Sequence, residues 1–105
     1  MMLRRFQKGG KVYMLYATKI KMKTGCEHSN STLEIADIYI SGGLNPGFAS
    51  KEAVHNHLKI NPKTICVNIP PYPYLVPVTS VTGEKYVRSQ ANDTSSDNLL
   101  KLPRI

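Results

Sequence analysis

Residues 12–23, VYMLYATKIKMK, decide the fold of this chain, because their side chains fall into two sets at alternate positions. Alternate side chains of a β-strand point to opposite faces. The stretch therefore predicts a strand with one face made of Val12, Met14, Tyr16, Thr18, Ile20 and Met22. The opposite face carries Tyr13, Leu15, Ala17, Lys19, Lys21 and Lys23, so its second half is strongly basic.

A second strand and a helix are predicted next along the chain. The isoleucine-rich stretch 33–40 has strand character, and the Gly, Asn and Pro of residues 41–47 end it. Ser50 is a favourable N-cap for a helix from Lys51 to about Ile60, which Asn61-Pro62 stops. Helical spacing places Ala53, Val54, His57 and Leu58 on the packed face and His55 on the polar edge.

Three further strands complete the predicted fold. The stretch 64–69 is β-branched, and the stretches 74–81 and 84–90 flank a turn at Thr82-Gly83. Residues 99–102 carry three leucines that we expect to fold back onto the sheet. The order β-β-α-β-β-β predicts a single α+β domain, with four or five mostly antiparallel strands and one helix on a face.

The positive charge of the chain is concentrated at its start. The net charge is +7, and the first 23 residues hold seven Lys and Arg and no acid. Residues 1–10, with Arg4 and Arg5, end in two glycines and predict a flexible basic arm before a domain of residues 11–105. A localised positive field attracts phosphate, acidic protein surfaces or anionic lipid.

Composition narrows the class of protein. No apolar run approaches the roughly 20 residues that span a bilayer, and no uninterrupted apolar segment follows the basic start as in a signal peptide. Cys26 and Cys66 are too few for a disulfide scaffold. We therefore expect a cytoplasmic protein that makes no contact with a membrane.

Metal binding and catalysis are disfavoured by spacing. His55 and His57 lie about 200° apart on a helix, so they cannot both reach one ion with Cys26, His28 and Cys66. A catalytic dyad of Cys66 with His57 is conceivable, but a buried free cysteine is usually inert. The sequence lacks a serine-nucleophile elbow and a phosphate-binding glycine loop. We expect no enzyme activity, cofactor, metal or small-molecule substrate.

The basic strand face has three interpretations. Its lysines, together with Arg4 and Arg5, would follow a nucleic-acid backbone or fit an acidic groove of a protein partner. Alternatively, lysines on a solvated edge strand only prevent edge-to-edge aggregation. Tyr72 and Tyr74, in a proline-rich segment, are candidate interface anchors or simply cover the edge of the sheet.

The end of the chain resembles a known family. Tyr86-x-Arg88 and the run Asp97-Asn98-Leu99-Leu100-Lys101-Leu102-Pro103 are similar to the C-terminal signature of a small prokaryotic family catalogued as a domain of unknown function. The resemblance extends from about Tyr16 to Arg104. It implies a compact domain without an assigned activity, and Arg88 joins the candidate binding residues.

These observations predict a protein that acts by binding. Small basic domains of this kind are similar in size and style to proteins of phages and other mobile elements. The most specific hypothesis is an anti-CRISPR inhibitor of a Cas9-type nuclease, which would bind a host protein or ribonucleoprotein complex. The competing hypotheses are a small basic nucleic-acid-binding module and an interaction domain with another role.

Overall fold

The computed structural model describes residues 7–8, 11–12, 14–43, 46–90 and 97–105. Arg4 and Arg5 lie outside the described residues, and the boundary predicted near residue 11 stays a prediction. The elements, in chain order, are β1 (Gln7–Lys8), β2 (Lys11–Val12), β3 (Leu15–Met22), the 3-10 helix η1 (Thr32–Glu34), β4 (Ile35–Ser41), β5 (Gly47–Ser50), α1 (Lys51–Ile60), β6 (Ile65–Val67), β7 (Leu75–Thr79), β8 (Lys85–Ser89) and the 3-10 helix η2 (Asn98–Lys101).

β3 is an inner strand of a four-stranded sheet with the order β5-β4-β3-β6. β4 pairs with it antiparallel along one edge, and β6 pairs in parallel with its first half. β6 therefore covers only the first half of the β3 edge opposite β4. The C-terminal segment covers the second half of the same edge, where Ile20 N donates to Pro103 O and Ile105 N donates to Ile20 O. β3 is therefore not an edge strand, and the interpretation that Lys19 and Lys21 only prevent edge-to-edge aggregation is wrong.

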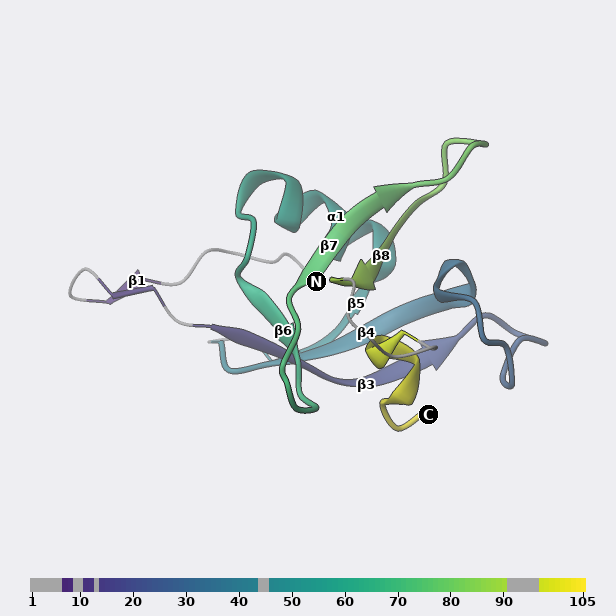
Figure 1. Ribbon diagram of the computed structural model, residues 1–105, viewed down its shortest axis with the longest axis horizontal. Helices are drawn as coiled ribbons and strands as arrows, with labels where there is room; N and C mark the ends of the chain where they lie inside the picture. The colour runs from purple at the N-terminus through teal and green to yellow at the C-terminus, as the bar shows by residue number, and fades with distance from the viewer. Residues whose placement is uncertain (1–6, 9–10, 13, 44–45, 91–96) are drawn as a thin grey trace.

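A second layer covers one face of this sheet. α1 contacts β4, β7 and β8, and η2 contacts β3 and β8; Figure 1 shows the helix and the β7–β8 hairpin above the β3 and β4 ribbons. The predicted single α+β domain is confirmed. The core between the layers includes the fully buried side chains of Leu15, Ile20, Ile35, Ile38, Val54, Leu58, Ile65, Val67, Leu75, Val87 and Leu99.

The predicted helix is confirmed. The Ser50 hydroxyl accepts a hydrogen bond from Ala53 N at 3.1 Å, which satisfies one of the free amides of the first turn. Val54, His57 and Leu58 are buried, as predicted. The expected polar position of His55 is wrong, because β8 packs on that side of the helix and leaves His55 4% exposed.

A bulge in β3 changes the predicted strand faces. The register with β4 shifts between Ala17 and Lys19, so Thr18 is an extra residue in the strand. Leu15 and Ala17 consequently point into the core on the same side as Ile20 and Met22. The prediction that Leu15 and Ala17 share a face with the lysines is therefore wrong.

The other elements follow the prediction, but three short strands are additional: β1 and β2, which pair with each other in a separate sheet, and β5. Gly83, with φ +90°, turns the β7–β8 hairpin, and Leu99, Leu100 and Leu102 are buried as expected. β5 was not predicted, because the Gly and Pro before it indicate a loop. No helix in the described part of the chain has the length and apolar character needed to cross a bilayer.

Candidate functional site

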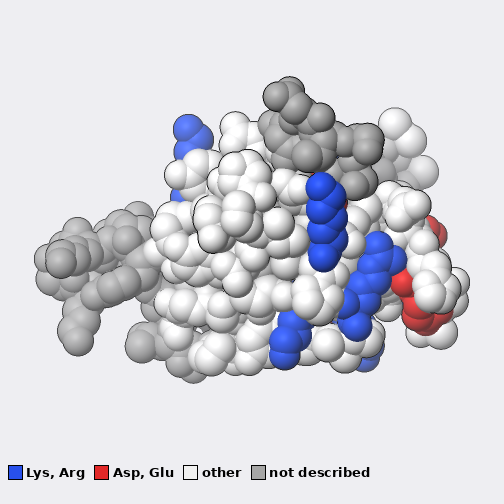
Figure 2. Space-filling view, turned by 60° about the horizontal axis from the view of Figure 1, so that its bottom comes forward, with Lys and Arg blue, Asp and Glu red and all other residues white. Residues whose placement is uncertain are grey.

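The side of the four-stranded sheet turned away from α1 carries exposed side chains on β3 and β5, and we call it the open face. Lys19 and Lys21 of β3 are exposed there. Tyr39 of β4 and Phe48 of β5 stand beside Lys19 in register, because Lys19 pairs with Tyr39 and Tyr39 pairs with Phe48. Figure 2 shows separate Lys and Arg side chains on this side of the molecule, while the Asp and Glu in view gather toward one end (right).

The three side chains form a contiguous row across three strands. The rings of Tyr39 and Phe48 meet edge to face, with centroids 5.2 Å apart and an angle of 88° between planes. Lys19 Nζ lies 5.1 Å from the centroid of the Tyr39 ring, within the range of a cation–π interaction. Lys19 is therefore held against an aromatic surface while its ammonium group remains accessible.

Lys21 continues the basic character of the open face. It lies opposite Asp37 in the β3–β4 register, so the carboxylate partly offsets its charge. Neither Lys19 nor Lys21 has a carboxylate within ion-pair distance among the described residues, whose ion pairs both involve Glu84. Two ammonium groups are thus available to an anionic partner.

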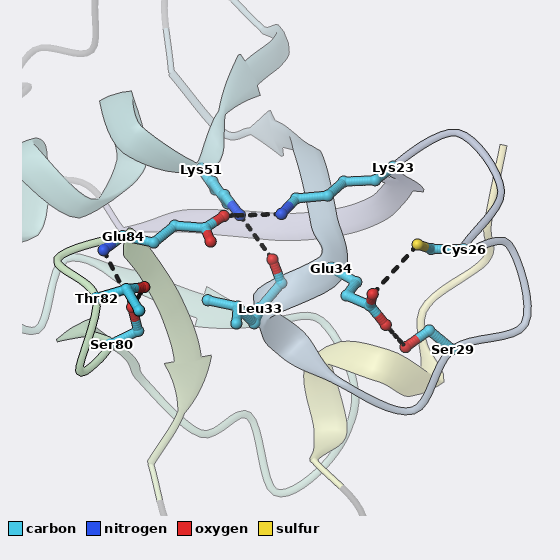
Figure 3. A network of polar contacts seen from close by, with 9 residues as sticks. All are labelled: Lys23, Cys26, Ser29, Leu33, Glu34, Lys51, Ser80, Thr82 and Glu84. Carbon is cyan, nitrogen blue, oxygen red and sulfur yellow. Dashed lines mark hydrogen bonds and ion pairs between the residues drawn. The ribbon is translucent and has the colours of Figure 1, made fainter.

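Lys23 does not belong to the open face, contrary to the sequence prediction. Its ammonium group lies 2.8 Å from Glu84 Oε2, in the turn between β7 and β8. Figure 3 shows Lys23 and Lys51 converging on this carboxylate from two sides. A second register shift lies between Lys21 and Met22, just before Lys23. The side chain of Lys23 accordingly points away from the face that carries Lys19 and Lys21.

Lys51 is the buried member of this ion cluster. Its side chain is 3% exposed, and Nζ donates to Glu84 Oε2 and, at 2.6 Å, to Leu33 O. The hydrogen bonds from Lys23 and Lys51 lower the pKa of Glu84 to about 2, and the same contact with Glu84 raises the pKa of Lys23. The cluster joins the start of α1, the end of β3 and the β7–β8 turn, which is a structural role.

Cys26 is held as a thiol. Its Sγ donates to Glu34 Oε2 at 3.3 Å, and the Ser29 hydroxyl donates to the other oxygen of Glu34. The contact with Glu34 raises the pKa of Cys26, and burial raises the pKa of Cys66. A raised pKa lowers the thiolate fraction, so neither cysteine has the character of an activated nucleophile.

The two helix histidines bind separate partners. Tyr86 O can only accept, so His55 Nδ1, 3.0 Å away, carries a proton. Thr64 gives its hydroxyl proton to Asn61 O, so His57 Nε2 donates to Thr64 Oγ1 at 3.1 Å. Burial lowers the pKa of His57, which keeps the imidazole neutral at pH 7. The two rings therefore hydrogen-bond α1 to the backbone of β8 and to the Thr64 hydroxyl.

Metal-ligating side chains do not gather in the part of the chain that the structure describes. No group of three or more His, Cys, Asp and Glu there could hold one ion. Cys26 Sγ and His57 Nε2, which could ligate a metal, are instead hydrogen-bonded to Glu34 and Thr64. The set of Cys26, His28, His55, His57 and Cys66 is therefore not assembled among these residues.

The remaining sequence candidates are scattered. Tyr72 is 50% exposed in the turn after β6 and has a positive φ of 58°. Tyr74 is half-buried, bridges to Cys66 of the edge strand β6 and accepts a hydrogen bond from Gln90 N, so it lies along the edge of the sheet. Arg88 is exposed on β8, in a different sheet from Lys19 and Lys21.

The sequence analysis missed the aromatic residues of the open face. The signal was present in β4, where Asp37, Tyr39 and Ser41 alternate with buried Ile38 and Ile40. Phe48 was not identified because β5 is short and follows a stretch rich in turn-forming residues. Only the pairing of β5 with β4 places Phe48 beside Tyr39.

Comparison with known proteins gives one match. The model of a family described as "Protein of unknown function (DUF3892)" matches residues 17–103. No curated protein and no solved structure matches the chain significantly. The match agrees with the expected membership of a family of domains of unknown function and brings no activity with it.

Proposed function

The chain belongs to the DUF3892 family of proteins of unknown function, and we propose that it acts by binding nucleic acid through the open face, without catalysis. Its partner is free nucleic acid or the exposed nucleic acid of a host ribonucleoprotein complex. The proposed place of action is the cytoplasm, where such partners occur and free thiols persist.

One observation carries the proposal. On the open face Lys19 and Lys21 present ammonium groups, no described residue places a carboxylate within ion-pair distance of them, and an aromatic row adjoins them. Basic groups bind phosphates by releasing counterions, and aromatic rings add contacts to bases. Arg4, Arg5, Lys8 and Lys11 precede β3 in the sequence and add positive charge to the same end of the chain.

The reduced set of lysines changes the expected salt dependence. Seven phosphate contacts would give a slope of log affinity against log salt of about −6 on duplex DNA. Lys23 is engaged by Glu84, so the described part of the open face supplies two lysine contacts. On a single strand these two contribute a slope of about −1.4, because each phosphate contributes about −0.7.

Inhibition of a host nucleic-acid-processing complex is the narrower form of the proposal. A protein with a net charge of +7 is poorly suited to imitate DNA. It would instead contact exposed guide RNA or bound DNA in a Cas9-type nuclease, whose own channels are positively charged. Titration into a DNA-cleavage reaction tests this: inhibition that saturates near one protein per complex supports anti-CRISPR activity.

Direct binding is tested with fluorescently labelled single-stranded oligonucleotides at several salt concentrations. Changing both Lys19 and Lys21 to Gln should weaken binding about tenfold at low salt and flatten the slope by about 1.4. Changing Lys59 and Lys85 to Gln is the matched control, because both are exposed lysines of other elements, α1 and β8. Asp37→Asn should strengthen binding, since it removes the carboxylate opposite Lys21.

Two results would contradict the proposal. Equal losses in the two double variants would mean that net charge alone, rather than the open face, governs binding. Absence of measurable binding to any oligonucleotide at low salt would exclude the nucleic-acid function.

A further inference from the structure

Phe48 is a large apolar side chain on the open face with 38% of its surface exposed. It stands on β5, at the edge of the four-stranded sheet, with its neighbour Ala49 buried beneath. Exposure of an aromatic ring is disfavoured by the hydrophobic effect unless a partner covers it. The ring of Phe48 is therefore a surface from which a partner could exclude water.

The surroundings of Phe48 are anchored. Its edge-to-face contact with Tyr39 fixes one side of the ring, and Lys19 rests against Tyr39. The chain thus presents an aromatic surface and an ammonium group on neighbouring strands. A nucleotide carries the complementary pair of features, a flat base and a phosphate joined through one sugar.

Single-stranded and duplex nucleic acids differ in what they can offer this row. Bases of a single strand can unstack and lie on an aromatic ring, whereas duplex bases remain stacked on one another. Phosphates are available in both forms. The row should therefore favour a single strand, while the lysines alone would bind either form.

We infer that Phe48 is a base-stacking position and that the open face selects single-stranded nucleic acid, with phosphates held at Lys19 and Lys21. The inference rests on the proposed nucleic-acid function and adds the form of the ligand. Charge complementarity between the two lysines and a polyanion identifies the occupant. Base stacking is sequence-tolerant, because every base has an aromatic face, so we expect little preference among sequences.

The test compares three labelled ligands of equal length: a single-stranded oligonucleotide, its duplex, and a single strand of abasic sugar-phosphate. Phe48→Ala should weaken binding of the base-containing single strand about tenfold, because it removes the stacking of a base on the aromatic ring. Its affinity for the abasic strand should equal that of the unaltered protein. Phe48→Tyr, which keeps an aromatic ring, should restore binding of the base-containing strand.

Controls separate this inference from the proposed function. Val81→Ala removes a fully exposed apolar side chain from the β7–β8 turn and should leave all three affinities unchanged. Changing both Lys19 and Lys21 to Gln should weaken the binding of all three ligands. Circular dichroism verifies that each variant is folded.

Each outcome has a distinct meaning. Unchanged binding of the single strand by folded Phe48→Ala, or equal affinity of the unaltered protein for base-containing and abasic strands, would overturn the stacking position. If the lysine variants still weaken binding in that case, the nucleic-acid function stands without it. Loss of both effects, with no binding to any of the ligands, would remove the proposed function itself.

Discussion

Replacing Leu58 with alanine tests the packing of the helix that carries the second layer. Leu58 is 1% exposed and belongs to the core between α1 and the sheet. The substitution removes three carbon atoms, which corresponds to about 2.4 kcal/mol of transfer free energy at about 0.8 kcal/mol per methylene. The cavity left behind raises the expected loss in the free energy of unfolding to about 3 to 4 kcal/mol.

That loss is large for a domain of this size. Small domains are stable by about 5 to 15 kcal/mol, so Leu58→Ala should remove a substantial part of the total. Urea unfolding followed by far-ultraviolet circular dichroism measures it, and the midpoint should fall by about 1 to 4 M if the m-value stays near the usual 1 to 3 kcal/mol/M. Circular dichroism is the suitable probe because the chain has no tryptophan.

Ile60→Ala is the matched control on the same helix. Ile60 is 79% exposed, so its truncation should change the free energy of unfolding by less than about 0.5 kcal/mol. The orientation of the helix would be refuted if Leu58→Ala lowered the free energy of unfolding by less than about 0.5 kcal/mol. It would also be refuted if Ile60→Ala lowered it more than Leu58→Ala does.

Three further outcomes follow from the polar contacts. Glu84 has a pKa of about 2 in the fold against 4.5 as its reference, so its stabilising contribution is complete above pH 4.5 and is lost as the pH falls toward 2. Glu84→Gln should therefore be less stable than the unaltered protein at pH 7, with a difference that shrinks in thermal unfolding between pH 4.5 and 2; a constant difference would contradict the ion cluster. Glu34→Gln should lower the raised pKa of Cys26 and speed its alkylation at pH 8 while Cys66 reacts as before, whereas equal rates at Cys26 with and without Glu34 would argue against the thiol–carboxylate contact. His55→Ala should cost about 2 kcal/mol or more in urea unfolding, because it leaves the Tyr86 carbonyl without its partner, and a negligible cost would restore His55 to the polar edge.

Local signals in the sequence predict much of the fold. Ser50 caps the helix, Gly83 marks the hairpin turn, and both lie at the predicted positions. The leucines after Asp97 also pack as expected, because an apolar cluster in a short polar context has few alternatives to burial. Each of these features depends on residues close together in the chain.

The candidate site was predicted only in part, because it depends on contacts between distant residues. Lys19 and Lys21 were identified from alternation, but the partner of Lys23 lies 61 residues away and gives no local signal. The bulge at Thr18 shifts the strand faces without a glycine to indicate it. Phe48 gains its role from strand pairing, which periodicity within one segment cannot show.

The C-terminal hydrogen bonds to Ile20 have a consequence for the synthesis of the protein. During translation β3 and β4 emerge long before Pro103 and Ile105, which later occupy the second half of the β3 edge. Until then this half of β3 exposes unpaired amides and carbonyls, and such an edge is a template for pairing with another chain. Nascent or prematurely terminated chains should therefore self-associate more readily than the finished protein, and early engagement by a chaperone would protect them.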